Sequence, residues 1–242
     1  MIQFDRVSFF YGKKPVLTYF SLTVPDGELL SVMGPSGGGK TTLLHLMAGL
    51  RTPTGGTLTV DEHLPAVAFQ EPRLFPWLTA LGNVRAVLPK DAPAAVADEA
   101  LALVGLSDEA NALPDALSGG MRSRVSLARA VAYGEAVGSS LYLLDEPFSA
   151  LDEATRQTLC AALRERIRAA GATAVLVTHD PDDAARFGDR VIRVGDGNDS
   201  NNSNVGNVGN DGNNGNDSNH GNDGNRGGDP SPDGGKSGPE TV

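Results

Sequence analysis

The sequence contains a single cysteine, Cys160, among its 242 residues. One cysteine excludes a disulfide bond within the chain and is typical of a protein from a reducing compartment. Cys160 lies in a predicted amphipathic helix, residues 153–170, on which Leu159, Leu163 and Ile167 share one face, so we expect it in the core. Hydrophobic residues make up 40% of the chain, which is enough to bury a sizeable core.

Long apolar runs and an excess of positive charge are also missing. No window reaches the roughly 18–20 apolar residues of a membrane-spanning helix. The first residues, MIQFDRVSFFYG, lack the basic and apolar regions of a secretory signal. The 30 acidic residues outnumber the 20 Lys and Arg residues, and no basic stripe occurs. The excess of acidic residues argues against nucleic acid as a partner. Together with the missing apolar run and signal, it leads us to expect a soluble, cytoplasmic protein.

The composition changes abruptly near Gly197. From Asn198 to Val242 the chain is mostly Asn, Gly, Asp and Ser, with almost no large apolar side chain. Such a segment cannot bury enough surface to offset the entropy lost on ordering. We therefore predict a folded domain over residues 1–197 and a disordered tail over residues 198–242.

The strongest motif occupies residues 29–50. Residues 29–33 predict a buried strand and residues 41–50 an apolar helix, and the sequence between them fits the phosphate-binding loop G-x-x-x-x-G-K-T. Its glycines let backbone N–H groups face phosphate oxygens, and the helix N-terminus adds partial positive charge. Lys40 is expected to reach the β- and γ-phosphates, and Thr41 to bind Mg²⁺. The predicted nucleotide-binding residues are Gly34, Pro35, Ser36, Gly37, Gly38, Gly39, Lys40, Thr41 and Thr42.

A second predicted strand ends in two acidic residues. Residues 141–144 form a continuous apolar run, typical of a central parallel strand, and Asp145 and Glu146 follow. We expect Asp145 to hold Mg²⁺, directly or through water, and Glu146 to activate the attacking water as a general base. Acidic pairs after strands also cap helices. Here Pro147 places the pair in a turn, where catalytic groups collect in α/β sheets.

The remaining motifs resemble those of the ATP-binding cassette (ABC) family. LSGGM, residues 117–121, resembles the family signature, and SALD, residues 149–152, resembles its D-loop. VTHD contains its switch histidine, His179. Gln70 matches the glutamine of its Q-loop, and Tyr11 matches the aromatic residue that stacks on adenine. The resemblance extends from the N-terminus to about Val194.

This resemblance implies a phosphate-loop NTPase fold. We expect an α/β core with a mostly parallel sheet, an N-terminal antiparallel β-region near residues 2–68, and a helical subdomain over roughly residues 71–138. The family also implies a nucleotide contact for Asp152 and an Mg²⁺ and catalytic role for Gln70. His179 is implied to contact the γ-phosphate and place water against Glu146, although a histidine in this position can also act as a simple cap or a buried donor.

The signature suggests a dimer. Ser118, Gly119 and Gly120 open a predicted helix, whose N-terminus is a second anion site. One chain already has its own phosphate loop, so a second site makes sense if it completes the site of another copy. The family implies a head-to-tail pair that encloses two ATP molecules, which is a closed symmetric assembly. A helix N-cap with flexible glycines is the alternative explanation.

Two further features resemble the importer subgroup for nitrate, sulfonate and taurine. Met121 stands where many family members have Gln, and residues 69–77 read FQEPRLFPW. The aromatic and proline residues of this stretch either fill the edge of a core or form an interface with a membrane subunit. Two departures are Ser123, where Gln is common, and the short segment between Lys40 and Gln70, which trims the antiparallel region.

The function implied by the resemblance is ATP hydrolysis that powers solute import. The permease would be a separate transmembrane protein, served by an external solute-binding protein, and this chain would lie on the inner face of the membrane. The alternatives are an ABC-type ATPase in nucleic-acid or assembly machinery, an exporter subunit, and a scaffold that does not hydrolyse ATP. The transported solute is not encoded in this chain.

Overall fold

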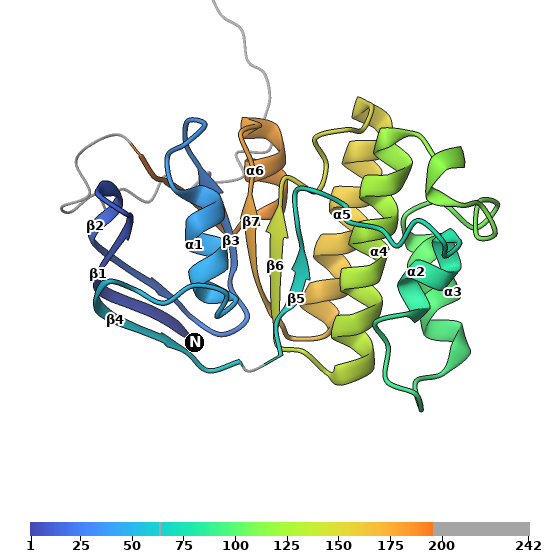
Figure 1. Cartoon of the computed structure of the whole chain (residues 1–242), viewed down its shortest axis with the longest axis horizontal. Helices are drawn as coiled ribbons and strands as arrows, with labels where there is room; N and C mark the ends of the chain where they lie inside the picture. The colour runs from blue at the N-terminus through green and yellow to red at the C-terminus, as the bar shows by residue number, and fades with distance from the viewer. Residues whose placement is uncertain (63, 196–242) are drawn as a thin grey trace, which may run out of the picture. The chain divides into compact units, whose positions relative to one another are not determined.

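The computed structural model describes residues 1–62 and 64–195 (Figure 1). The predicted disordered tail, residues 198–242, lies outside the described residues. Within the described residues, no helix is both long enough and apolar enough to cross a membrane.

The larger sheet of the described chain has five parallel strands in the order β5-β6-β7-β3-β8. Every residue of β3, β6 and β7 is buried, as expected for central strands covered on both faces. Strands β3 and β6 confirm the strands predicted over residues 29–33 and 141–144. The five strands are β3 (Leu29–Met33), β5 (Ala66–Ala68), β6 (Leu141–Asp145), β7 (Thr173–Val177) and β8 (Arg190–Arg193).

A smaller antiparallel sheet has the order β2-β1-β4. It consists of β1 (Ile2–Tyr11), β2 (Lys14–Val24) and β4 (Gly55–Val60). The predicted antiparallel region is therefore present, but it ends at Val60. The three residues of β5 pair in parallel with β6, so they belong to the larger sheet.

Helix α1 (Lys40–Met47) lies between the two sheets (Figure 1). Leu43, Leu44, Leu46 and Met47 are buried in one hydrophobic cluster with residues of β1, β2, β3, β6 and β7. This packing holds the first turn of α1, and therefore the preceding loop, against the centre of the larger sheet.

Helices α4, α5 and α6 pack on the opposite face of the larger sheet, and α2 and α3 pack on the outer side of α4 (Figure 1). One continuous buried cluster joins sheet residues such as Leu144 and Leu176 to helix residues such as Val84, Val131 and Leu163. The helices predicted over residues 71–138 thus share a core with the sheet. The helices within residues 71–138 are α2 (Ala80–Arg85), α3 (Ala94–Leu103), the short 3₁₀ helix η1 (Pro114–Ala116) and α4 (Gly119–Val137), and those after this range are α5 (Glu153–Ala169) and α6 (Pro181–Phe187).

The cysteine lies in this core, as the helical pattern predicted. Cys160 is 1% exposed in α5, and Leu159, Leu163 and Ile167 are buried beside it. Burial raises the pKa of the Cys160 thiol to about 11. The thiolate, which is the reactive form, is therefore scarce at neutral pH.

Asp183, in the first turn of α6, is a buried carboxylic acid. It is 2% exposed, and its Oδ1 has no hydrogen-bond partner within residues 1–62 and 64–195. Burial, assisted by the nearby Asp180 carboxylate, raises the pKa of Asp183 to about 6. An unfolded aspartate titrates near pH 4. The folded protein therefore binds this proton more tightly, and stability falls as pH rises from about 4 to about 6.

We expect Asp183→Asn to stabilise the protein at neutral pH, because the amide cannot ionise. The free energy of unfolding should rise by about 1–3 kcal/mol at pH 7.5, and the gain should disappear near pH 4. Urea unfolding at both pH values measures this difference. Asp182→Asn, at the exposed neighbouring position, is the control. An equal gain at both pH values would contradict the assignment of the shift to Asp183.

Candidate nucleotide-binding site

The predicted site residues follow strands that end at the same edge of the larger sheet. Val32 of β3 pairs with Val177 of β7, and Val177 pairs with Asp145 of β6. Leu144, one residue earlier in β6, pairs with Ala68 of β5. Because the strands are parallel, the segments after them emerge side by side at their carboxyl ends. This register brings together the phosphate loop, Gln70, Glu146 and His179.

The phosphate loop is pressed against the end of β8. Gly34 has φ 154°, and a Cβ at this position would lie 2.1 Å from the Val194 carbonyl oxygen. The Val194 N–H donates to the Met33 carbonyl oxygen at 2.9 Å, which fixes this close approach. Only glycine fits at position 34. Pro35, Ser36, Gly37, Gly38 and Gly39 complete the loop, and Thr41 and Thr42 lie in the first turn of α1.

Lys40 is folded into the loop. Its Nζ donates to the carbonyl oxygens of Gly34 at 2.8 Å and Pro35 at 3.0 Å, and the residue is 9% exposed. The ammonium group therefore lies inside the turn that the sequence predicts to surround phosphate. These carbonyl contacts hold the ammonium group in place. The predicted contact between Lys40 and phosphate remains a prediction.

Asp145 and Thr41, two of the predicted Mg²⁺ ligands, lie together. Asp145 is 4% exposed, and its Oδ1 has no hydrogen-bond partner in the described part of the chain. Burial raises the pKa of the Asp145 carboxyl, and the Thr41 hydroxyl beside it opposes the shift. A buried carboxylate oxygen without a partner is costly unless a cation meets it.

The oxygen ligands here suit magnesium. No cluster of three His, Cys, Asp or Glu residues able to hold a metal occurs within residues 1–62 and 64–195. Mg²⁺ does not need such a cluster, because it is commonly held by one or two protein oxygens together with phosphates and water. The hydroxyl of Thr41 and the unpartnered oxygen of Asp145 fit that requirement.

Glu146 and His179 form a pair at the same edge. His179 Nδ1 lies 2.8 Å and 2.9 Å from the two carboxylate oxygens of Glu146. The Glu146 side chain is 11% exposed, whereas the His179 side chain is 69% exposed, so the histidine covers the carboxylate from the solvent side. Glu146 also has φ 51°, which is uncommon for a residue with a side chain. Backbone strain of this kind collects at functional sites.

Gln70 and Tyr11 lie on the surface. Gln70 is exposed two residues beyond β5. Tyr11 is 45% exposed, with its ring edge-on to Phe9 at a centroid distance of 5.0 Å. The Arg51 guanidinium carbon lies 5.6 Å from the centroid of the Tyr11 ring. Tyr11 is not a core residue, and adenine stacking at this ring remains a prediction.

The signature residues form the N-terminus of α4. The Ser118 Oγ accepts from the Met121 N–H at 3.2 Å, and the Met121 Sδ accepts from the Ser118 N–H at 3.4 Å. The thioether thus takes the place that Glu or Gln occupies in the usual capping box. This arrangement satisfies two backbone donors where the predicted anion site lies.

The two signature glycines have different surroundings. A Cβ on Gly119 would meet no atom within 4 Å, whereas a Cβ on Gly120 would lie 2.5 Å from the Ala150 carbonyl oxygen. Gly120 therefore lets α4 touch the D-loop, residues 149–152. Gly119 leaves open space, which suits a ligand.

Asp152 ends the D-loop as the N-cap of α5. Its Oδ1 accepts from the Thr155 N–H at 3.0 Å, and this hydrogen bond lowers the pKa of Asp152. The side chain is therefore engaged within its own chain. Its predicted contact with nucleotide is an additional role that remains a prediction.

The aromatic and proline stretch of residues 69–77 is held from inside by two side chains. Asn83, fully buried, accepts from the Phe75 N–H at 2.7 Å and donates to three backbone carbonyls of residues 75–79. Arg129 of α4 donates to the carbonyls of Pro72 and Arg73. Among the aromatics, Phe75 is 39% exposed and Trp77 is 71% exposed. The end of the stretch is thus a braced surface loop, not a filled core edge.

Three supporting residues were not predicted from the sequence: Asn83, Arg129 and Arg156. Arg129 and Arg156 bind groups 57 and 24 residues away along the chain, whereas Asn83 binds backbone groups four to eight residues before it. An Asn or Arg at one position in a helix carries no local pattern that distinguishes such a brace from a surface residue. Only the position of Asn83 in an apolar helical stretch hints at burial.

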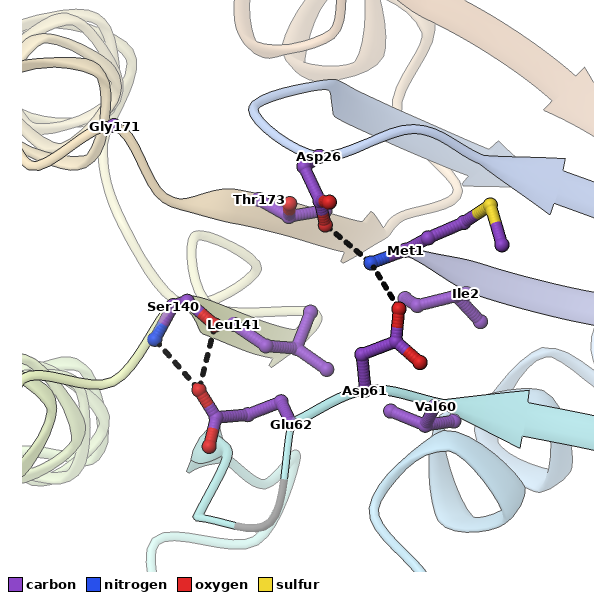
Figure 2. Close-up of a pocket in the computed structure, with 10 residues that line it drawn as sticks. All are labelled: Met1, Ile2, Asp26, Val60, Asp61, Glu62, Ser140, Leu141, Gly171 and Thr173. Atoms are coloured by element: carbon purple, nitrogen blue, oxygen red, sulfur yellow. Dashed lines mark hydrogen bonds and ion pairs between the residues drawn. The ribbon is translucent and has the colours of Figure 1, made fainter.

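A separate pocket of about 280 Å³ lies at the opposite edge of the sheets (Figure 2). Its lining includes Leu141 and Thr173, which begin β6 and β7, and Asp26 and Asp61, which pair with the N-terminal ammonium group. Glu62 accepts hydrogen bonds from the Ser140 N–H and hydroxyl. Because parallel strands begin here, this pocket is not the candidate nucleotide site.

Phosphate-loop nucleotide-binding proteins have a parallel sheet, a glycine loop after one strand that leads into a helix, and a carboxylate at the end of another strand. The described chain has these features in β3, the loop, α1 and Asp145 of β6. The chain is a nucleotide-binding protein of this class.

Comparison with known proteins identifies the family. Residues 17–149 match the family described as ABC transporter, and the chain belongs to this family. It is 45% identical over 198 residues to an aliphatic sulfonates import ATP-binding protein, SsuB, of Mycobacterium avium (strain 104), covering 79% of this chain and 76% of that protein. The SsuB of Albidiferax ferrireducens is 44% identical over 194 residues, covering 77% of this chain and 68% of that protein.

The solved structures agree with this family. The dimeric post-hydrolysis state of the ATP-binding cassette MJ0796, bound to ADP and Pi, has a TM-score of 0.73 and 32% identity. The match covers 81% of this chain and 95% of that chain. The predicted α/β fold, with its parallel sheet, antiparallel N-terminal strands and helices, is confirmed.

We expect the two signature glycines to respond differently to alanine. Gly120→Ala should lower the free energy of unfolding by about 1–3 kcal/mol, because the added methyl overlaps the Ala150 carbonyl. Gly119→Ala should change it by less than about 0.5 kcal/mol, because its Cβ meets no neighbour. Urea unfolding of the two variants beside the wild type measures the difference. Equal destabilisation by both variants would show that overlap with the Ala150 carbonyl does not determine the loss of stability in Gly120→Ala.

Proposed function

We propose that this chain is the ATP-hydrolysing subunit of an ABC importer and powers the passage of a small solute through a separate membrane permease. The observation that carries the proposal is the contact of His179 with Glu146 at 2.8 Å, at the sheet edge that also holds the phosphate loop. A subunit that only bound nucleotide would not need this pair. The names of the relatives, which are import ATP-binding proteins for aliphatic sulfonates, favour import over export and over work on nucleic acid.

The phosphates of ATP bind to the loop. Backbone N–H groups of residues 36–39 and of the start of α1 face the β- and γ-phosphates, and Lys40 exchanges its carbonyl contacts for phosphate oxygens. Thr41 and Asp145, with Gln70, would hold Mg²⁺, which would supply positive charge against the phosphates. Tyr11 stacks on the adenine ring.

Hydrolysis uses Glu146 as the general base. Its carboxylate accepts a proton from water as the water oxygen attacks the γ-phosphorus, and the bond from that phosphorus to the bridging oxygen breaks to release ADP. His179 holds the Glu146 side chain before nucleotide arrives, and it contacts the γ-phosphate afterwards. Asp145 would place its buried carboxylate beside the cation.

The active form is a pair of copies arranged head-to-tail. Gly119 opens the capped start of α4, and a Cβ there would meet no atom of the described chain within 4 Å, which leaves room for a ligand. The start of α4 completes the γ-phosphate site of the second copy, and Asp152 approaches the same interface. The dimeric ATP-binding cassette among the similar structures supports this arrangement.

The surface loop with Phe75 and Trp77, here called the aromatic patch, is the proposed contact with the permease. The two rings lie 5.6 Å apart and are both exposed. An exposed aromatic pair on a braced loop is typical of a protein interface. Through this contact the chain would lie on the cytoplasmic face of the membrane. An external solute-binding protein would deliver the solute, a role taken from the importer subgroup alone.

If Glu146 is the general base, Glu146→Gln should bind ATP normally and lose about 10²–10⁴-fold in turnover. The uncleaved ATP should hold two copies together, which is visible as a dimer by size-exclusion chromatography. Glu165→Gln, an exposed position on α5, is the matched control and should hydrolyse ATP at the wild-type rate. Near-normal turnover of Glu146→Gln would reject the assignment.

Trp77→Ala should leave ATP affinity unchanged and weaken the permease complex by about 2 kcal/mol or more, because interface tryptophans act as anchors. ATP binding is measured on the isolated chain, and permease association on the reconstituted complex. Tyr19→Ala is the control, since Tyr19 is 70% exposed but lies in β2 of the antiparallel sheet. Normal association of Trp77→Ala would show that the aromatic patch is not the docking surface.

A further inference from the structure

Arg156 of α5 bridges two segments that flank the catalytic pair. Its Nη1 donates to Asp180 Oδ2 at 2.6 Å, and its Nη2 donates to the Leu151 carbonyl oxygen at 3.1 Å. Leu151 belongs to the D-loop, and Asp180 directly follows His179. One guanidinium group therefore connects the D-loop to the histidine segment.

This bridge is largely enclosed. The Arg156 side chain is 20% exposed, and the Asp180 side chain is 27% exposed. A charge-assisted hydrogen bond of this length between shielded groups is stronger than a pair on the open surface. The nearest other carboxylate to the guanidinium, that of Glu153, is 3.8 Å from Nη1. Asp180 is thus the main charge partner of Arg156 within the described residues.

The Asp180 end of the bridge fixes the backbone around His179. Asp180 Oδ1 accepts from the N–H groups of Asp182 at 2.8 Å and Asp183 at 3.3 Å, so it caps α6. The Asp180 N–H also donates to the Thr178 hydroxyl at 3.0 Å. With Arg156 on its second oxygen, Asp180 has little freedom to rotate. The backbone that carries the exposed His179 ring is held on both sides.

The Leu151 end of the bridge reaches Glu146. The Ser149 N–H and hydroxyl both donate to the Glu146 carbonyl oxygen, at 3.3 Å and 3.0 Å. The Leu151 N–H donates to the Phe148 carbonyl oxygen at 3.1 Å. Residues 146–151 therefore form a short, hydrogen-bonded turn from Glu146 into the D-loop, and the turn ends at the carbonyl to which Arg156 donates.

We propose that Arg156 is a positioning residue for ATP hydrolysis, which sets the placement of His179 relative to Glu146 by tying Asp180 to the D-loop. The inference rests on the proposed ATPase function. Arg156 touches neither Glu146 nor His179, and it acts on both through the backbone. Without it, the histidine segment and the D-loop are free to separate, while the phosphate loop keeps its own contacts with α1 and β8.

A second arginine of α5 provides a matched control. Arg164 also bridges to a carbonyl and a carboxylate, with Nε to the Phe187 carbonyl oxygen at 2.9 Å and Nη2 to Asp189 Oδ1 at 2.9 Å. It lies two turns further along α5, away from the D-loop. Arg164→Gln therefore removes a bridge of the same kind without changing the surroundings of His179.

The test compares steady-state ATP hydrolysis of the full chain and its variants. Arg156→Gln should lower kcat by about 10- to 100-fold, the range expected for a small misplacement of catalytic groups. Its KM for ATP should stay within about twofold, because the phosphate-binding contacts are unchanged. Arg164→Gln should keep the wild-type kcat even where its melting temperature falls. Arg156→Lys, which keeps the charge but loses the two-armed geometry, should give an intermediate kcat.

A double-mutant cycle tests the path through Asp180. Asp180→Asn should also lower kcat. The kcat of the double variant, Arg156→Gln with Asp180→Asn, should be only slightly below that of the slower single variant. If the kcat of the double variant instead fell by the product of the two single losses, the residues would act independently and the path through Asp180 would be contradicted.

Two other results would overturn the proposal. One is a normal kcat for Arg156→Gln, and the other is a parallel loss of ATP affinity and kcat in that variant. Failure of the proposed function is distinguishable from both outcomes, because it would appear as undiminished hydrolysis in Glu146→Gln or as no hydrolysis by the wild type.

Discussion

The parallel pairing of β3 with β7 on one side and β8 on the other is the constraint on which the site depends. It places the loop after β3 beside the ends of β6 and β7, and it presses Gly34 against the Val194 carbonyl. Moving either neighbour by one residue would displace the loop relative to Asp145 and turn buried side chains outward. The positions of the reacting groups follow from backbone hydrogen bonds in the sheet.

The fold places apolar side chains along the central strands and the charged groups of the site at the ends of these strands. The strands β3, β6 and β7 are buried along their whole length, and the two hydrophobic clusters cover both faces of the sheet. Groups that are costly to bury, such as the Asp145 carboxylate and the Lys40 ammonium, lie where these strands end. The large core offsets the cost of the unpartnered carboxylate oxygen, which leaves that oxygen available to a cation.

Local spacing made much of this architecture predictable. The strand, loop and helix of residues 29–50 occur as expected because the motif describes one continuous piece of backbone. The strand before Asp145 and the capped helix after Ser118 were predictable for the same reason. Three residues are too few to show a period, so the parallel pairing of β5 did not follow from the sequence. The roles of Arg129 and Arg156 depend on partners far along the chain, and the contrast between Gly119 and Gly120 depends on where Ala150 lies.

The contact between Gly34 and Val194 also bears on when the protein can first bind its ligand during synthesis. The phosphate loop is made early, but the strand that supports it, β8, is the last strand of the described chain. Until β8 leaves the ribosome, β3 has an unpaired edge, and the phosphate loop lacks its contact with the Val194 backbone. Nucleotide therefore cannot guide the early stages of folding. It can stabilise the nascent protein only after nearly all of the domain has emerged.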